Sequence, residues 1–204
     1  MNTLGKCVFL DKDGTLIHDV PYNVDIGKIR CYDDIYGPLQ RLSAAGYQLI
    51  IVSNQAGLAK RYFTEAELHR AFEHLITALG NEGIAISGYY YCPHAAPDAP
   101  EKAACLCRKP QPGLLLQAAE DHHIDLSRSW MIGDILADTG AGRAAGCRTI
   151  LLDRSGHERT LPAYLDPALR PDYLVDDFRS VDTIIQNTKL HDYECTYRQH
   201  YSAV

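Results

Sequence analysis

Short apolar runs alternate with segments of helical period along most of this chain. The apolar runs are typical of buried strands and cover residues 7–10, 47–52, 87–91, 130–132, 148–152 and 173–175. Apolar positions recur at helical spacing in residues 33–45, 64–79, 112–122, 137–145 and 181–190. Strands that alternate with helices imply right-handed crossovers and a parallel sheet. We therefore predict an α/β fold in which helices cover both faces of a parallel sheet.

Local signals mark where several of these helices begin and end. Thr64 and Glu67 stand at the spacing of a capping box, so a helix is expected to begin there. Pro112 stands early in the first turn of another predicted helix, a position that proline tolerates. Gly46 and Gly146 directly follow two apolar periods, where glycine commonly ends a helix.

The composition is that of an ordinary globular protein. The chain has 204 residues, of which 46% are hydrophobic and 23% are charged, and no internal repeat or long linker divides it. Residues 1–190 are therefore expected to form one domain. Residues 191–204 lack an apolar period and are expected to form a loosely ordered tail. We expect the protein to be a monomer.

Charge and hydropathy argue against two classes of partner. The formal net charge of -6 offers no basic face for nucleic acid. No apolar stretch approaches the length that spans a membrane, and the first six residues lack the pattern of a secretory signal. Seven cysteines in a chain without an export signal favour metal binding over disulfides. We therefore expect a cytoplasmic protein that binds neither nucleic acid nor membrane.

The first apolar run ends in two carboxylates, Asp11 and Asp13, which Gly14 and Thr15 follow at once. Ligands in open α/β sheets bind beyond the carboxyl ends of the strands, so both carboxylates are expected at the mouth of a crevice. Residues i and i+2 of an extended chain point the same way. Such a pair can hold Mg2+, or it can supply a nucleophile beside a proton carrier. The alternative interpretation is a strand that ends in an acidic turn.

Two further polar segments can bind phosphate. Ser53, Asn54 and Gln55 follow the second predicted strand, where a hydroxyl and two amides can donate hydrogen bonds to phosphate oxygens. Arg108 and Lys109 precede a predicted helix, where the lysine can neutralise charge on a transferring phosphoryl group and the arginine can grip phosphate. Considered alone, the first segment could be a plain polar turn, and the second could be a solvated basic pair.

Asp134 and Asp138 follow the predicted strand at 130–132. Asp134 can complete an oxygen-ligand Mg2+ site with Asp11, and Asp138 can anchor the loop behind it. A helix N-cap is the alternative for either residue, and for Asp138 both interpretations can hold. Because these polar residues fall at the ends of separate strands, they can converge on one crevice.

A second constellation joins Cys92, His94, Cys105 and Cys107, with the spacing Cys-x-His-x10-Cys-x-Cys. Three thiolates and one imidazole make a closed tetrahedral Zn2+ set of the structural type. Four protein ligands leave no open position, which argues against catalysis at this metal. The alternative interpretation is a chance grouping of buried cysteines. We predict a zinc-stabilised loop over residues 92–107.

These motifs resemble those of the haloacid dehalogenase (HAD) superfamily of phosphatases over about residues 6–153. The closer resemblance is to the D-glycero-D-manno-heptose 1,7-bisphosphate 7-phosphatases, whose zinc-loop subgroup also includes the histidinol-phosphate phosphatases. It is carried by Phe9-Leu10-Asp11-Lys12-Asp13-Gly14-Thr15, Ser53-Asn54-Gln55-Ala56-Gly57-Leu58-Ala59, Phe63-Thr64-Glu65-Ala66, Tyr90-Tyr91-Cys92-Pro93-His94, Cys105-Leu106-Cys107-Arg108-Lys109-Pro110-Gln111-Pro112-Gly113 and Met131-Ile132-Gly133-Asp134. The resemblance implies a HAD-like, Rossmann-type parallel sheet with no separate cap domain.

The resemblance also implies roles for individual residues. Asp11 is the implied nucleophile and Asp13 the implied general acid/base, while Ser53 and Lys109 steady the phosphoryl group. The implied Mg2+ ligands are Asp11, the backbone carbonyl of Asp13, and Asp134. The implied substrate-binding residues are Asp19, Tyr22, Ser53, Asn54, Gln55, Arg108 and Lys109. The implied activity is Mg2+-dependent release of the 7-phosphate from a small phosphorylated sugar through an aspartyl phosphate, with Zn2+ in a structural role.

Two positions depart from the family pattern. Ile135 stands where members often carry Lys, which removes a charge near the metal site and bears on rate or exact substrate. Ser53 stands where Thr is usual, and it keeps the hydroxyl. A phosphatase for histidinol phosphate or another sugar phosphate is an alternative within the same fold. A zinc-stabilised binding module without catalysis is an alternative from another class, against which the joint presence of the implied catalytic residues speaks.

Overall fold

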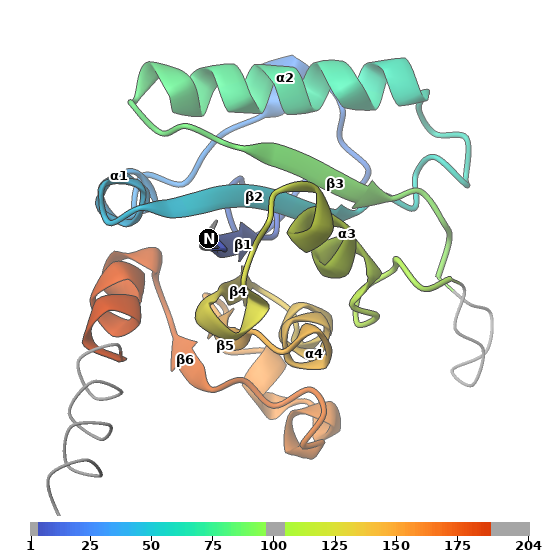
Figure 1. Cartoon of the computed structure of the whole chain (residues 1–204). Helices are drawn as coiled ribbons and strands as arrows, with labels where there is room; N and C mark the ends of the chain where they lie inside the picture. Colours follow the sequence, from blue (N-terminus) through green and yellow to red (C-terminus); the bar gives the residue numbers. More distant parts are fainter. Residues whose placement is uncertain (1–3, 97–104, 189–204) are drawn as a thin grey trace, which may run out of the picture.

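Six parallel strands form one sheet in the computed structural model, which describes residues 4–96 and 105–188. The strands are β1 (Lys6–Leu10), β2 (Tyr47–Asn54), β3 (Gly88–Cys92), β4 (Trp130–Gly133), β5 (Arg148–Leu152) and β6 (Tyr173–Val175). Their order across the sheet is β3-β2-β1-β4-β5-β6, and every pair is parallel (Figure 1). This confirms the predicted parallel α/β sheet and all six predicted strands.

The strand order changes direction between β1 and β4. From β1 the chain moves outward through β2 to β3, and it then returns to lay β4 against the other side of β1. In the register of this central pair, Leu10 stands opposite Ile132. A topological switch point of this kind opens a crevice beyond the carboxyl ends of the two strands. The residues that directly follow β1 and β4 therefore meet at one place.

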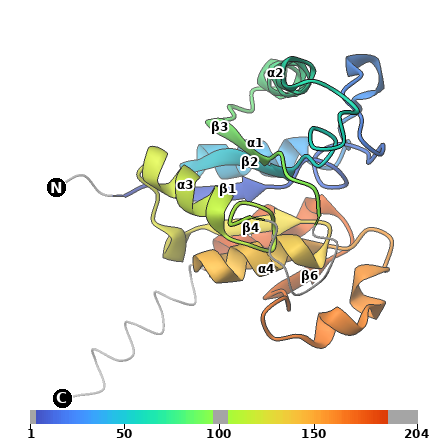
Figure 2. The ribbon, with the colours of Figure 1, turned by 90° about the vertical axis from the view of Figure 1, so that its right-hand side faces the viewer.

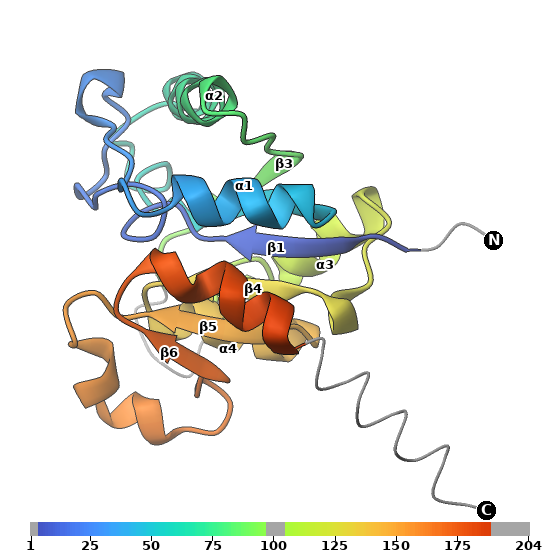
Figure 3. The ribbon, with the colours of Figure 1, turned by 90° about the vertical axis from the view of Figure 1, so that its left-hand side faces the viewer.

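Helices cover both faces of the sheet, because each strand sends alternate side chains to opposite sides. Figures 1 and 3 show α1 (Tyr36–Ala44) and the helix at residues 181–188 on one face, and Figure 2 shows α3 (Gly113–Asp121) and α4 (Leu136–Ala145) on the other. The long helix α2 (Glu65–Asn81) covers the β3 end of the sheet. Short 3-10 turns complete the fold, namely η1 (Ile26–Lys28), η2 (Leu126–Arg128), η3 (Glu158–Thr160), η4 (Pro162–Leu165) and η5 (Phe178–Ser180).

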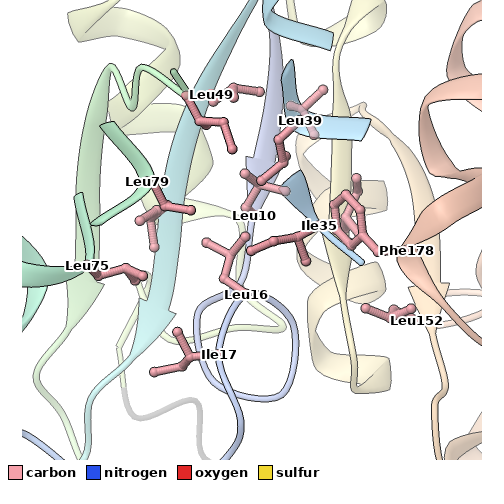
Figure 4. Packing of buried hydrophobic residues seen from close by; sticks show 14 of the residues in the cluster. Leu10, Leu16, Ile17, Ile35, Leu39, Leu49, Leu75, Leu79, Leu152 and Phe178 are labelled. Carbon is pink, nitrogen blue, oxygen red and sulfur yellow. The ribbon is translucent and has the colours of Figure 1, made fainter. Parts of the chain in front are cut away.

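The alternation along β1 divides the core into two clusters. Leu10 belongs to a cluster that includes side chains of α1, α2 and the 181–188 helix, and Figure 4 shows it close to Leu39, Ile35 and Leu16. Phe9 points to the opposite face and packs against α3 and α4. Both side chains are fully buried. Strand β1 is therefore held from both sides, which makes its carboxyl end a rigid platform for the residues that follow.

The predicted helix boundaries were close but not identical to the observed ones. Thr64 caps α2 through the expected capping box with Glu67, and the helix runs two residues past the predicted end. The predicted helix at 33–45 begins only at Tyr36. The reason is a distant contact, because the Asp34 carboxylate binds Arg154 through two hydrogen bonds of 2.7 and 2.9 Å and so serves as an anchor rather than a helical residue.

Three expectations concern residues outside the described ranges in whole or in part. The tail predicted at 191–204 lies entirely outside them, and so do residues 97–104 of the zinc loop and the last two residues of the helix predicted at 181–190. Among the described residues, the structure contains no helix with the length and apolar character needed to cross a membrane.

Candidate active site and metal centre

The crevice at the switch point collects the polar residues that follow three neighbouring strands. Asp11 follows β1, and its backbone N–H donates to the carbonyl oxygen of Ile132 in β4 at 2.9 Å. Asp134 follows β4, and Ser53 lies near the end of β2. The structure therefore brings together side chains that stand more than one hundred residues apart in the sequence.

Lys109 lies at the centre of this crevice. Its side chain is 1% exposed, and its Nζ lies 2.5 Å from Asp11 Oδ1 and 2.5 Å from Asp138 Oδ1. It also donates to the carbonyl oxygen of Val52 at 2.9 Å. Burial alone would lower the pKa of the ammonium, but Asp11 and Asp138 outweigh burial and raise it. Lys109 is therefore a fixed positive charge beside the predicted nucleophile.

The crevice holds more carboxylates than this one cation can neutralise. Ligand oxygens of Asp11, Asp134 and Asp138 all lie within 4.8 Å of one another. Burial first, together with the neighbouring carboxylates, raises the pKa of Asp11 to about 7 and that of Asp134 to about 9. A cluster of hard oxygen donors with excess negative charge fits a divalent cation such as Mg2+.

Asp138 combines the two roles that the sequence allowed it to hold together. Its Oδ2 accepts a hydrogen bond from the Ile135 N–H at 3.2 Å, which caps the first turn of α4. Its other oxygen pairs with Lys109 at 2.5 Å. Gly133 makes room for this carboxylate, because a Cβ at position 133 would lie 2.1 Å from Asp138 Oδ2. The sequence predicted Asp138 as an anchor behind the metal site, and the structure in addition places its carboxylate oxygen among the possible ligand atoms.

The residues at the end of β2 hold other parts of the site in place. The Asn54 side chain accepts from the Lys109 N–H at 3.1 Å and donates to the Lys109 carbonyl at 3.2 Å. The Gln55 amide donates to Asp13 Oδ2 at 3.0 Å and to Ser53 Oγ at 2.8 Å. Both amides are thus engaged with protein groups, while Ser53 and Asn54 also line the crevice.

Two cavities meet above this cluster. An inner cavity of about 180 Å3 is lined by Asp11, Asp13, Asp19, Ser53, Asn54, Lys109, Asp134 and Ile135. An outer cavity of about 290 Å3 shares Asp13, Asp19 and Asn54 with it and adds Tyr22 and Arg108, among others. The inner cavity suits a phosphoryl group beside the carboxylates. The outer cavity offers room for the rest of a small substrate, and Asp19, Tyr22 and Arg108 are among the residues that line it.

The predicted zinc ligands converge at the end of β3. The ligand atoms of Cys92, His94, Cys105 and Cys107 all lie within 4.8 Å of one another. Cys107 Sγ lies 3.3 Å from His94 Nδ1 and 3.2 Å from Cys105 Sγ. Three sulfurs and one imidazole nitrogen at this spacing fit a tetrahedral Zn2+ site.

Electrostatics around the Cys105 sulfur favour the thiolate. Burial raises the pKa of this thiol, but hydrogen bonds from Cys107, Cys92 and the Arg108 N–H outweigh burial and lower it to about 7. The Arg108 N–H donates to Cys105 Sγ at 3.2 Å, and the guanidinium donates to the His94 carbonyl at 3.1 Å. The metal-binding loop and the basic pair beside the crevice are therefore directly connected.

Comparisons with known proteins show which family this chain resembles. Residues 106–181 match the family model described as HAD-hydrolase-like. The chain is 35% identical over 185 residues to the D-glycero-beta-D-manno-heptose-1,7-bisphosphate 7-phosphatase of Pasteurella multocida, an alignment that covers 90% of this chain and 98% of that protein. The enzyme of the same name from Photorhabdus laumondii is 41% identical over 152 residues, which cover 73% of this chain and 80% of that protein.

A solved structure shows the same architecture. The crystal structure of the D,D-heptose 1,7-bisphosphate phosphatase of B. bronchiseptica, in complex with magnesium and phosphate, superposes with a TM-score of 0.76 at 27% identity. The superposition covers 90% of this chain and 99% of that chain. The agreement extends over nearly all of both chains, so it concerns the whole architecture and not one shared motif.

Proposed function

We propose that this chain, which belongs to the HAD-like D-glycero-beta-D-manno-heptose-1,7-bisphosphate 7-phosphatase family, removes the 7-phosphate of that sugar bisphosphate. The reaction is the hydrolysis of a phosphoric monoester. The observation that carries the proposal is the buried contact between Lys109 Nζ and Asp11 Oδ1 at the floor of the inner cavity. That contact sets a charged, oriented carboxylate beside the space for a phosphoryl group.

Asp11 and Asp13 divide the chemistry between them. Asp11 attacks the phosphorus atom and forms an aspartyl phosphate, while the bond from phosphorus to the sugar oxygen breaks. The Asp13 carboxyl gives its proton to the leaving sugar oxygen and later takes a proton from the water that attacks the aspartyl phosphate. Phosphate is then released, and both aspartates return to their starting states.

The carboxylate cluster supplies the ligands for Mg2+. Asp11, Asp134 and the backbone carbonyl of Asp13 are the proposed ligands, in keeping with the clustering of the Asp11 and Asp134 oxygens. When bound, the ion shields the negative charges of the nucleophile and the phosphate from each other. Asp138 supports the arrangement from behind, because it pairs with Lys109 and caps α4.

The remaining cavity residues bind the substrate. Ser53 and Lys109 hold the phosphoryl oxygens, and Arg108 binds the more distant part of the substrate from the outer cavity. Asp19 and Tyr22, on the loop after β1, face the sugar. The zinc ion is proposed to be structural, because Cys92, His94, Cys105 and Cys107 supply four protein ligands.

A substrate panel tests this function directly. Phosphate release is measured with both anomers of heptose 1,7-bisphosphate, with histidinol phosphate and with common sugar monophosphates. The proposal expects the highest kcat/KM for one heptose bisphosphate anomer. A higher value for histidinol phosphate would assign the chain to the other branch of the zinc-loop subgroup. No turnover of any phosphate ester by the Mg2+-loaded protein would favour the binding module.

A further inference from the structure

A second lysine of the site is buried without lining either cavity. The side chain of Lys12, which stands between Asp11 and Asp13 in the sequence, is 4% exposed. Its Nζ lies 2.5 Å from Asp13 Oδ1 and 6.0 Å from the centroid of the Phe72 ring on α2. Among residues 4–96 and 105–188, this is the one hydrogen bond that the Lys12 ammonium makes. Burying an ammonium is unfavourable unless a partner offsets it, so the position of Lys12 is tied to Asp13.

The two lysines of the site serve different carboxylates. Lys109 binds Asp11 and Asp138, whereas Lys12 binds Asp13. Lys12 is absent from the linings of both the inner and the outer cavity, so it does not face the space where a substrate fits. Its hydrogen bond reaches Asp13, and its charge also acts on Asp19, where it opposes the rise in the pKa that burial and Asp13 cause. Asp13 is therefore the direct route by which Lys12 affects the reaction, and Asp19 is a more distant one.

Asp13 is held from two sides. Lys12 contacts its Oδ1, and the Gln55 amide donates to its Oδ2 at 3.0 Å. The Asp13 side chain nevertheless keeps 28% of its surface exposed and lines both cavities. The carboxylate is thus anchored on each oxygen and still reachable from the cavities. An anchored group of this kind loses little time in unproductive rotamers, which is a known source of rate.

We propose that Lys12 is a positioning residue for the general acid. The Lys12 ammonium donates a hydrogen bond to Asp13 Oδ1 whether or not the carboxyl carries a proton. This hydrogen bond holds the carboxyl in place, so that its proton is delivered to the leaving sugar oxygen as the bond from phosphorus to that oxygen breaks. The inference rests on the role of Asp13 in the proposed function. It extends that function, because Lys12, which lies outside the cavities, would orient the proton donor Asp13.

The dependence of the rate on the leaving group separates this role from a general effect on folding. A sugar alkoxide is a poor leaving group that needs a proton, whereas p-nitrophenolate leaves with little protonation. The value of kcat/KM reports the steps up to formation of the aspartyl phosphate, so it isolates the proton donation. For Lys12→Met we expect kcat/KM to fall about 10- to 100-fold on the sugar phosphate that the panel identifies. On p-nitrophenyl phosphate we expect a change of less than about threefold.

Three variants complete the experiment. Asp13→Asn should show the same leaving-group dependence more strongly, and Lys12→Arg should recover most of the lost rate because it keeps the cation. Lys6→Met is the matched control, since Lys6 begins β1, the strand after which Lys12 comes, and its Nζ lies 4.3 Å from the centroid of the Tyr47 ring. We expect both substrates to be turned over normally by Lys6→Met.

The outcomes separate the proposal from its premise. Equal losses on both substrates in Lys12→Met, or no loss on either, would overturn the positioning role of Lys12. If Asp13→Asn itself shows no leaving-group dependence, the assignment of Asp13 as general acid fails instead, and the role of Lys12 fails with it. Should Lys12→Met not fold, Lys12→Gln removes the charge while keeping a polar tip, and the same result is expected from it.

Discussion

Gly14 and Asp134 fit together so closely that a side chain at position 14 would displace the Asp134 carboxylate. A Cβ built on Gly14 would lie 2.1 Å from Asp134 Oδ2, and the backbone of Gly14 has a φ of +81°. Both the space and the backbone conformation thus require glycine. The glycine of the first motif lets the loop after β1 approach the carboxylate that follows β4.

Replacement of Gly14 by alanine should therefore damage the site more than the fold. We expect Gly14→Ala to lower kcat/KM by on the order of 100-fold, because Asp134 must move away from its place in the carboxylate cluster. The control is Gly83→Ala, which carries a similar φ of +74° but has no atom within 4 Å of the added Cβ. The free energy of unfolding should fall by a similar amount in both variants, about 1 kcal/mol, because alanine is strained at a positive φ. Equal activity in the two variants would contradict the close fit.

Replacement of Asp11 and replacement of Asp13 should impair turnover in different ways. Asp11→Asn removes the nucleophile and should abolish turnover of every substrate. Asp13→Asn removes the proton carrier and should lower kcat on the sugar substrate by about 10²–10⁴-fold. With p-nitrophenyl phosphate, Asp13→Asn should accumulate the aspartyl phosphate, because formation needs little acid while hydrolysis needs the base. Acid-quench labelling measures this intermediate, and its absence from Asp13→Asn would count against the division of roles.

The sequence predicted the fold well because the signals that define it are local. Each buried strand is a compact apolar run, and the capping box of Thr64 is read from four adjacent residues. The start of α1 could not be read in this way. It depends on the ion pair between Asp34 and Arg154, which are 120 residues apart. Periodicity reports only what neighbouring residues prefer, and this contact overrides that preference.

The sequence predicted which polar residues would lie close together at the strand ends, but not which of them would bond to one another. The structure brings together Asp11, Lys109 and Asp134, as the strand ends implied. The pairing of Lys12 with Asp13 was not foreseen, because a lysine between two aspartates looks solvent-exposed in sequence. Burial of that lysine depends on how α2 packs over the loop, which no local pattern encodes.

Magnesium binding should be coupled to proton release. In the metal-free protein the pKa values of Asp11 and Asp134 are raised to about 7 and about 9, chiefly by burial, so at pH 7 the Asp134 carboxyl holds a proton. Mg2+ binds the deprotonated carboxylates, so its apparent affinity should rise with pH by about tenfold per unit between pH 7 and pH 9. Calorimetry in buffers of different ionisation enthalpy counts the released protons. An affinity that stays constant across this range would show that the cluster is already ionised.

The last prediction concerns the zinc loop. We expect one tightly bound Zn2+ per chain at Cys92, His94, Cys105 and Cys107, which metal analysis of protein purified without chelators measures directly. Arg108 directly follows Cys107, and its backbone N–H and guanidinium bind Cys105 and His94. A metal held by these ligands would therefore fix where Arg108 and the next residue, Lys109, lie.

Cys107→Ser should therefore change kinetics through the neighbouring cations. We expect kcat/KM on the best substrate to fall on the order of 100-fold, together with a loss of discrimination between substrates, even where circular dichroism shows an intact sheet. Cys31→Ser is the control, because Cys31 is a partly buried cysteine outside the cluster. If Cys107→Ser loses zinc but keeps its kinetics, the metal does not position Arg108 and Lys109. Four protein ligands leave no position for water, so zinc removal should act on geometry and leave the pH profile of the remaining activity unchanged.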